Sequence, residues 1–203
     1  LLGLFAITPS AGPNGSIVPS NEISVVEGDN TNFVVTAAPY YHTSQVLTNG
    51  AADVAAAGLN SYTSWWNSVS ANGTIHADFD ENVTTNTQTP EWWLAQNGFT
   101  NEFEAATTND ADGDGVMTGD EYTADTNPTN GDSYLRLENI LIEGGNSLQW
   151  ASGTGVIQYL EWTANLTNTW SALATNTPPT PVTNTAPFSG DANQGFYRIR
   201  AVR

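Results

Sequence analysis

Acidic residues at alternating positions carry the clearest chemistry in the sequence. The segment from Asp110 to Glu121 reads Asp-Ala-Asp-Gly-Asp-Gly-Val-Met-Thr-Gly-Asp-Glu. It matches the twelve-residue calcium-binding pattern, with oxygen ligands at positions 1, 3 and 5, glycine at position 6 and glutamate at position 12. Three carboxylates this close together repel one another unless a cation neutralises them. The pattern therefore predicts a Ca²⁺ site.

Each expected ligand has a defined place in this loop. The first three carboxylates point inward from alternate residues, and Gly115 supplies the sharp backbone bend. The predicted ligands are Asp110, Asp112, Asp114, the carbonyl of Val116, Thr118 directly or through a water, and both carboxylate oxygens of Glu121. An affinity on the order of 10⁻⁴ to 10⁻³ M suits an extracellular module in which the ion is a constant staple.

Short helices are expected on the N-terminal side of the loop. Thr89 is a candidate cap, Pro90 suits the first helical position and Gly98 the stop, so residues 89–98 predict one short helix. Residues 101–107 predict a second. Because a calcium sensor pairs two loops between long amphipathic helices, these short helices favour a stabilising ion over a switch.

Strands are predicted on both sides of this segment. Residues 32–37 and 74–79 alternate apolar and polar side chains, so Ile75, Ala77 and Phe79 are expected on one face. Further strands are expected at 134–137, 147–150, 157–162 and 196–202. The predicted fold class is mainly β, with two small β domains joined by a short helical calcium-binding segment. The expected domains are 1–82, 83–132 for the helices and calcium loop, and 133–203 for a β-sandwich-like domain.

Three stretches resemble known families. Ordered landmarks over residues 7–80, among them Pro13-Asn14-Gly15 and Ala71-Asn72-Gly73-Thr74-Ile75, resemble the divergent internalin-type B-repeat of bacterial surface proteins, which implies a β-rich spacer or adhesive repeat. Residues 121–130, which continue the EF-hand-like loop, resemble the thrombospondin type 3 and dockerin-like calcium segments of exported bacterial proteins. Residues 159–170 with 196–200 look like the C-terminal β modules that follow such loops.

A second ion is an open possibility after the loop. The resemblance implies Gly-Thr-Asp-Pro where this chain has Asp125-Thr126-Asn127-Pro128. A further calcium ion could be bound by Asp125, Asn127 and Asp132, although this departure leaves the second site undecided.

Composition limits the partners. The formal net charge is −17, with no Lys and only four Arg, so nucleic acid is repelled. No segment is long and apolar enough for a membrane span. The chain has no Cys, which excludes disulfides and thiol chemistry and tilts the compartment towards a bacterial exported protein. The apolar residues 1–7 could be the tail of a cleaved signal, the first strand, or a strand inserted into a neighbouring copy.

The residues that could serve catalysis or sugar binding have simpler interpretations. No catalytic set is predicted, because His76 lies on the polar side of a strand and Glu102 and Glu104 suit a solvated helix face. The pairs Trp65-Trp66 and Trp92-Trp93 could stack on sugars, but adjacent aromatics more often divide between core and boundary.

The expected function is that of a non-enzymatic, calcium-stabilised structural protein, secreted or at the cell surface. It could be a subunit of an extracellular filament that exchanges its N-terminal strand with copies of itself or with other surface proteins. Two alternatives stay open, a non-catalytic C-terminal module of a larger exported enzyme and a carbohydrate-binding adhesin.

Overall fold

The computed structural model describes residues 3–141, 146–188 and 195–203. The described chain is mainly β, as the sequence predicts, and forms two compact units. Unit 1 comprises residues 1–83 and 90–92, and unit 2 comprises residues 84–89 and 93–203. The helical segment, apart from its first residues, therefore belongs to the same unit as the C-terminal strands.

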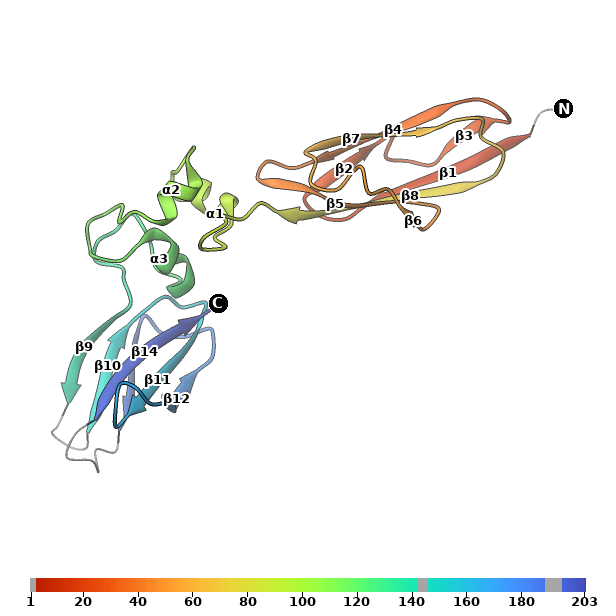
Figure 1. The fold of residues 1–203 in the computed structure, drawn as a ribbon. Helices are drawn as coiled ribbons and strands as arrows, with labels where there is room; N and C mark the ends of the chain where they lie inside the picture. Colours follow the sequence, from red (N-terminus) through yellow and green to blue (C-terminus); the bar gives the residue numbers. More distant parts are fainter. Residues whose placement is uncertain (1–2, 142–145, 189–194) are drawn as a thin grey trace. The chain divides into compact units, whose positions relative to one another are not determined.

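Unit 1 consists of two facing sheets (Figure 1). The first has the order β3-β1-β8-β5-β6, with β1 Leu4–Ala11, β3 Ile23–Val26, β5 Tyr41–Thr48, β6 Ala51–Ala52 and β8 Gly73–Glu81. The second has the order β2-β4-β7, with β2 Gly15–Val18, β4 Thr31–Ala37 and β7 Ser61–Trp66. All pairings are antiparallel except that of β1 with β8, which is parallel.

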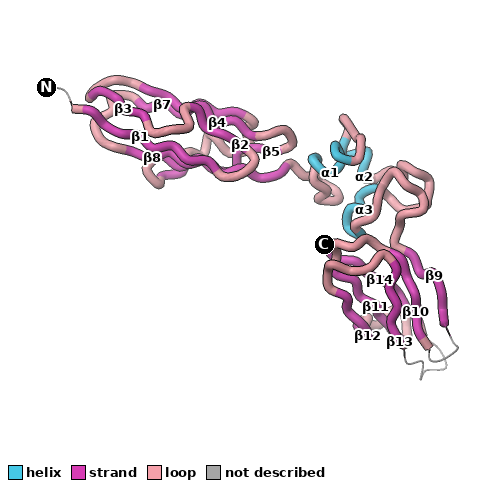
Figure 2. The backbone as a smooth tube through the Cα atoms, turned by 180° about the vertical axis from the view of Figure 1, so that it is seen from behind, coloured by secondary structure: helices cyan, strands magenta, loops and turns pink. Residues whose placement is uncertain are grey.

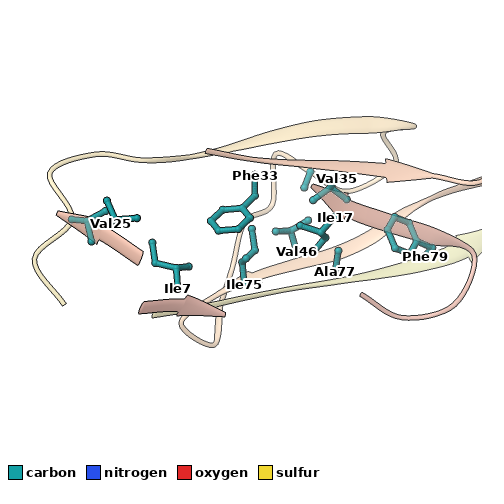
Figure 3. Close-up of a cluster of buried hydrophobic side chains, with 11 residues drawn as sticks. Ile7, Ile17, Val25, Phe33, Val35, Val46, Ile75, Ala77 and Phe79 are labelled. Atoms are coloured by element: carbon teal, nitrogen blue, oxygen red, sulfur yellow. The ribbon is translucent and has the colours of Figure 1, made fainter. Parts of the chain in front are cut away.

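The core of unit 1 lies between these sheets (Figure 3). Ile75 and Ala77 are fully buried and Phe79 nearly so, which confirms the predicted one-sided alternation of β8. Phe33 on β4 is also fully buried, and its ring meets that of Trp66 edge to face at 6.2 Å. Burial of these side chains is the dominant force that holds the two sheets together.

The N-terminal strand is an internal member of its sheet. Leu4 to Ile7 pair with β3, and Ile7 to Ala11 pair with β8. Residues 1 and 2 of the expected exchangeable segment lie outside the described residues, whereas Leu4 to Ile7 are paired within the chain itself.

Unit 2 begins with the helices, which are the cyan segments of Figure 2. They are α1 Glu91–Gln96, whose first residues belong to unit 1, α2 Phe103–Thr107 and α3 Thr118–Ala124. Two three-stranded sheets follow, β13-β10-β9 and β12-β11-β14, with β9 Arg136–Leu141, β10 Ser147–Ala151, β11 Ile157–Thr163, β12 Ser171–Asn176, β13 Thr183–Pro187 and β14 Phe196–Val202. The expected strand at 134–137 starts later, at Arg136.

The core of unit 2 is smaller and partly polar. Leu148, Trp150 and Leu160 are buried in one cluster. The Trp150 indole Nε1 donates to the Oε1 of buried Gln158 at 2.7 Å, so a hydrogen bond inside the core satisfies both groups. Among the described residues, no helix is long and apolar enough to cross a membrane.

Candidate metal centre

Three carboxylates of the predicted loop lie close together. Each of Asp110, Asp112 and Asp114 offers an oxygen within 4.8 Å of the other two, and all three side chains are half-buried. Three acidic oxygens at this spacing could hold a metal ion, as the sequence predicts.

The loop backbone sets these carboxylates in place. The amides of Gly113 and Gly115 each donate to one Asp110 oxygen at 2.8 Å. Gly115 adopts φ +95°, a left-handed conformation that favours glycine at this bend. The two amide bonds stabilise the anionic form, and the pKa of Asp110 is lowered, chiefly by the Gly115 amide.

Asp112 and Asp114 each use one oxygen inside the loop. Asp112 Oδ1 accepts from the Asp114 amide at 3.2 Å, and Asp114 Oδ1 accepts from the Val116 amide at 2.8 Å. The Oδ2 atom of each aspartate is buried and has no hydrogen-bond partner. Two acceptor oxygens are therefore held in place by the backbone and left unsatisfied.

The other two predicted side-chain ligands are also buried and unsatisfied. Thr118 and Glu121 are fully buried, and neither Thr118 Oγ1 nor Glu121 Oε2 has a partner. Of the six buried, unpaired side-chain polar atoms among the described residues, four belong to this loop. Buried polar groups are normally satisfied, so this concentration of unpaired oxygens in one loop is the arrangement expected of a site that binds a cation.

Glu121 also feels the charge of the aspartates. Burial, and after it the charges of Asp112 and Asp114, raise the pKa of this carboxyl to about 8, while a hydrogen bond from Thr126 opposes the shift. The compact group of carboxylates comprises only the aspartates. Glu121 lies close enough for their charges to act on it, and a cation would remove that repulsion.

α3 connects this loop to the sheets of unit 2. Asp125 follows the helix with φ 58°, and its Oδ2 accepts from the amides of Thr154 at 3.1 Å and Gly155 at 2.8 Å. Its Oδ1 pairs with Arg203. The Ala124 carbonyl accepts from the Gly153 amide at 3.2 Å. The helix thus begins in the acidic loop and ends bonded to the loop between β10 and β11 and to the C-terminus of β14.

Two of the residues expected to bind a second calcium ion already have hydrogen-bond partners within the chain. Both carboxylate oxygens of Asp125 already have partners, and Asn127 Oδ1 accepts from the amide and hydroxyl of Thr129. The structure thus gives Asp125 a role as an anchor for α3, which sequence reasoning missed because Arg203 lies 78 residues away.

Two further residues that support the loop were not predicted. Glu104, expected on a solvated face, accepts from the amides of Thr85 and Asn86 at 2.7 and 2.9 Å. A Cβ at Gly119 would lie 2.9 Å from a Thr87 methyl and 3.1 Å from the Thr107 carbonyl, so only glycine fits here without a shift. The 84–89 segment, α2 and the start of α3 therefore meet closely.

A serine, a histidine and an aspartate form a hydrogen-bonded chain in unit 1. Ser10 Oγ lies 2.8 Å from His76 Nδ1, and His76 Nε2 lies 3.1 Å from Asp78 Oδ1. The His76 and Asp78 side chains are 38% and 47% exposed. Water therefore weakens the electrostatic interactions among these three side chains. A catalytic triad instead lies in dry, preorganised surroundings that strengthen such interactions.

The tryptophan pairs divide as expected for a sheet and a helix. Trp65 is 67% exposed, whereas Trp66 packs against the core of unit 1. Trp92 donates its indole N–H to Glu81 at 2.6 Å. Trp93 is buried and meets the ring of Tyr122 edge to face at 5.1 Å.

All four arginines, each of which lies among the described residues, have partners within the chain. The four arginines each stack on an aromatic ring, at 4.3 to 4.7 Å from its centroid, and each pairs with a carboxylate. The pairs are Arg136 with Glu138 and Tyr134, Arg198 with Glu161 and Trp170, Arg200 with Glu161 and Tyr159, and Arg203 with Asp125 and Tyr122.

Comparison with known proteins identified no similar protein. Searches against protein-family models, curated proteins and solved structures found no match to this chain. The site is therefore interpreted from its own geometry.

Proposed function

We propose that the chain is a non-enzymatic structural module of a secreted or cell-surface protein, and that the loop from Asp110 to Glu121 binds Ca²⁺ to stabilise unit 2. The four buried, unpaired oxygens of the loop carry this proposal. A cation bound in the loop would neutralise the charge around these oxygens and supply the missing partner, whereas each unpaired buried oxygen otherwise costs free energy comparable to a lost hydrogen bond.

The donor set favours calcium among the common cations. Every proposed ligand is an oxygen, with no His or Cys nearby in the loop, and hard cations prefer oxygen. The loop offers a flexible set of carboxylate, hydroxyl and carbonyl groups, which suits the variable coordination of calcium. Mg²⁺ demands a stricter octahedral geometry and keeps several waters.

The ion would act through α3. The final ligand, Glu121, lies in this helix, and the helix ends at Asp125, which is bonded to the sheets of unit 2. Calcium bound at a hundredfold excess over its Kd stabilises the folded state by about 2.7 kcal/mol. Because calcium is constantly abundant outside cells, such a site suits an extracellular staple.

Assembly into filaments receives less support than the calcium site. Exchange of residues 1–7 with a neighbour would break the pairs that Leu4 to Ile7 make with β3. The proposal is therefore limited to a calcium-stabilised module, with copies of itself or other surface proteins as candidate partners. A place at the non-catalytic end of a larger exported enzyme fits the same observations.

The test is a calcium titration followed by calorimetry and by regional hydrogen exchange. We expect calcium to raise the melting temperature and to slow exchange over residues 93–203, with no effect over residues 3–83. Mg²⁺ at equal concentration should do much less. Equal protection of both regions, or none, would contradict the proposal.

Glu121→Gln gives a sharper test because the expected effect changes sign. Without metal, the variant should be at least as stable as the wild type, because the wild-type carboxyl must either stay charged beside three aspartates or take up a proton, and both cost free energy. With calcium it should be less stable, because a ligand is lost. Glu102→Gln, at an exposed acidic residue of unit 2 outside the loop, is the matched control and should respond to calcium as the wild type does.

A further inference from the structure

The outer face of the sheet β2-β4-β7 carries an unusual set of side chains. Alternation along each strand turns Ile17, Phe33, Val35 and Ser64 inward, where they are buried. The side chains on the opposite surface are those of Ser16, Val18, Asn32, Val34, Thr36, Ser61, Thr63 and Trp65, and this set is called the Trp65 face.

Trp65 is the largest group on this face and is 67% exposed. Its neighbour Trp66 is needed in the core, so alternation explains why residue 65 points outward. It does not explain why this residue is tryptophan, since a polar side chain would suit an open sheet better. An exposed indole on a rigid strand is a ready surface for stacking.

The apolar and polar groups of the face are contiguous. The register places Val18 beside Val34, Val34 beside Thr63, and Asn32 beside Trp65. Val18 is 62% exposed and Val34 36%. Amide and hydroxyl groups of Asn32, Thr36 and Thr63 therefore lie on the same surface as the indole and the valines.

The face is neutral in a strongly acidic chain. None of its eight residues is charged, although the chain has 21 Asp and Glu and a net charge of −17. A cationic partner would be drawn to the acidic residues elsewhere, and an anionic partner would be repelled by the chain as a whole. An uncharged ligand is the one that this face matches.

The area of the Trp65 face distinguishes between two uncharged occupants, a second copy of this face and a sugar ligand. Three strands spaced ~4.8 Å apart and ~3.4 Å per residue give a patch of roughly 200 to 300 Å². A stable dimer buries about 800 Å² on each partner, so a second copy would leave most of its interface outside this face. One or two sugar rings need no more area than the patch provides.

We propose that the Trp65 face binds a neutral polysaccharide. The apolar face of a pyranose ring stacks on the Trp65 indole, and the sugar hydroxyls exchange hydrogen bonds with Asn32, Thr63 and Thr36. The valines exclude water beside the stacked ring. This site is separate from the calcium loop, which lies in the other unit.

The test is retention of the full chain, in buffer with calcium, on insoluble neutral polysaccharides of different backbones, namely cellulose, chitin, xylan, mannan and β-1,3-glucan. We expect at least one to retain the protein. Trp65→Ala should weaken that retention at least tenfold, Trp65→Tyr should restore part of it, and Asn32→Ala should weaken it severalfold. The melting temperature should stay unchanged in all three.

Two matched controls show whether the loss of retention is specific to the Trp65 face. Leu166→Ala removes a similarly exposed apolar side chain, 61% exposed, in unit 2 and should bind as the wild type does. Glu121→Gln should also bind normally, so that failure of the calcium proposal and failure of this one are distinguishable.

Three outcomes would overturn the inference. The first is no retention on any neutral polysaccharide, and the second is equal retention of wild type and Trp65→Ala. The third is a dimer in analytical ultracentrifugation that Trp65→Ala dissociates, which would assign the face to a second copy.

Discussion

Unit 1 and unit 2 are stabilised internally by different interactions. Unit 1 has one core cluster of eleven buried apolar residues between two sheets, whereas the two clusters of unit 2 hold four and three. Among the described residues, every pair of an arginine with a carboxylate lies in unit 2, as does the acidic loop. Interactions between charges change with pH and are screened by salt, whereas apolar side chains have no charge to titrate or screen. Changes of pH and moderate changes of ionic strength should therefore affect unit 2 more than unit 1.

The largest effect is expected from Phe33→Ala in unit 1. This fully buried ring lies between the sheets, so its loss removes apolar burial and leaves a cavity, at a cost of about 3–5 kcal/mol. Regional hydrogen exchange should show the loss over residues 3–83, and calcium should not restore it. Trp65→Ala, with its ring in solvent, serves as the control; a similar loss there would refute the assigned core.

A smaller effect is expected from Gly153→Ala in unit 2. The added Cβ would clash with the Asp125 carbonyl oxygen, so the end of α3 must move away from residue 153. Overpacking of this kind costs about 1–3 kcal/mol. Because the shift acts through α3, we also expect weaker calcium binding by isothermal titration; unchanged calcium affinity would mean that the helix does not couple loop and sheets.

Glu161 makes unit 2 sensitive to acid. Its carboxylate is 7% exposed and accepts from Arg198 at 2.7 Å and Arg200 at 2.9 Å. Burial raises the pKa of Glu161, but the two arginines outweigh burial and lower it below the ordinary value of 4.5. The unfolded chain thus takes up the proton first, so the stabilisation is complete above pH 4.5 and disappears as the pH falls through the lowered pKa.

Glu161→Gln should therefore cost about 1–2 kcal/mol at pH 7, since the arginines are over two-fifths exposed and stay partly hydrated. Melting curves between pH 7 and 3 should fall less steeply for the variant than for the wild type. If the melting temperatures of the variant and the wild type fall equally with pH, Glu161 does not cause the acid sensitivity of unit 2.

The smallest effect is expected from Arg136→Gln. Its bond to Glu138 is 3.2 Å long, and both side chains are about a quarter to a third exposed. Exposed pairs contribute about 0.2–1 kcal/mol, and salt screens them. The loss should therefore shrink when the denaturant midpoint is measured at high salt, while a large, salt-independent loss would point to a packing role instead.

The features that sequence predicts best here are local. All the loop ligands fall within twelve residues, so spacing alone places Asp110, Asp112 and Asp114 together. The strands with clean alternation, such as β4 and β8, likewise lie near their predicted bounds. In both cases the information lies within one short segment.

Features that depend on distant partners could not be predicted. β12 and β13 lie in a polar stretch rich in Thr and Pro, and their pairing with β11 and β10 makes them strands. Glu104 accepts hydrogen bonds from two backbone amides that lie 18 and 19 residues earlier in the sequence. Asp125 pairs with Arg203, which lies 78 residues later. Tertiary contacts override local propensity at these positions.

The distribution of arginine has a consequence for proteolysis. Proteases of the trypsin type cleave after Lys or Arg, and in this chain the first such residue is Arg136. The stretch from residue 1 to residue 135 therefore offers them no cleavage site, whether it is folded or not. The peptide bonds after Arg136, Arg198 and Arg200 all lie in unit 2, where each arginine must leave its ring and its carboxylate before it can enter a protease pocket. Tryptic digestion thus reports on unit 2 alone and leaves unit 1 whole.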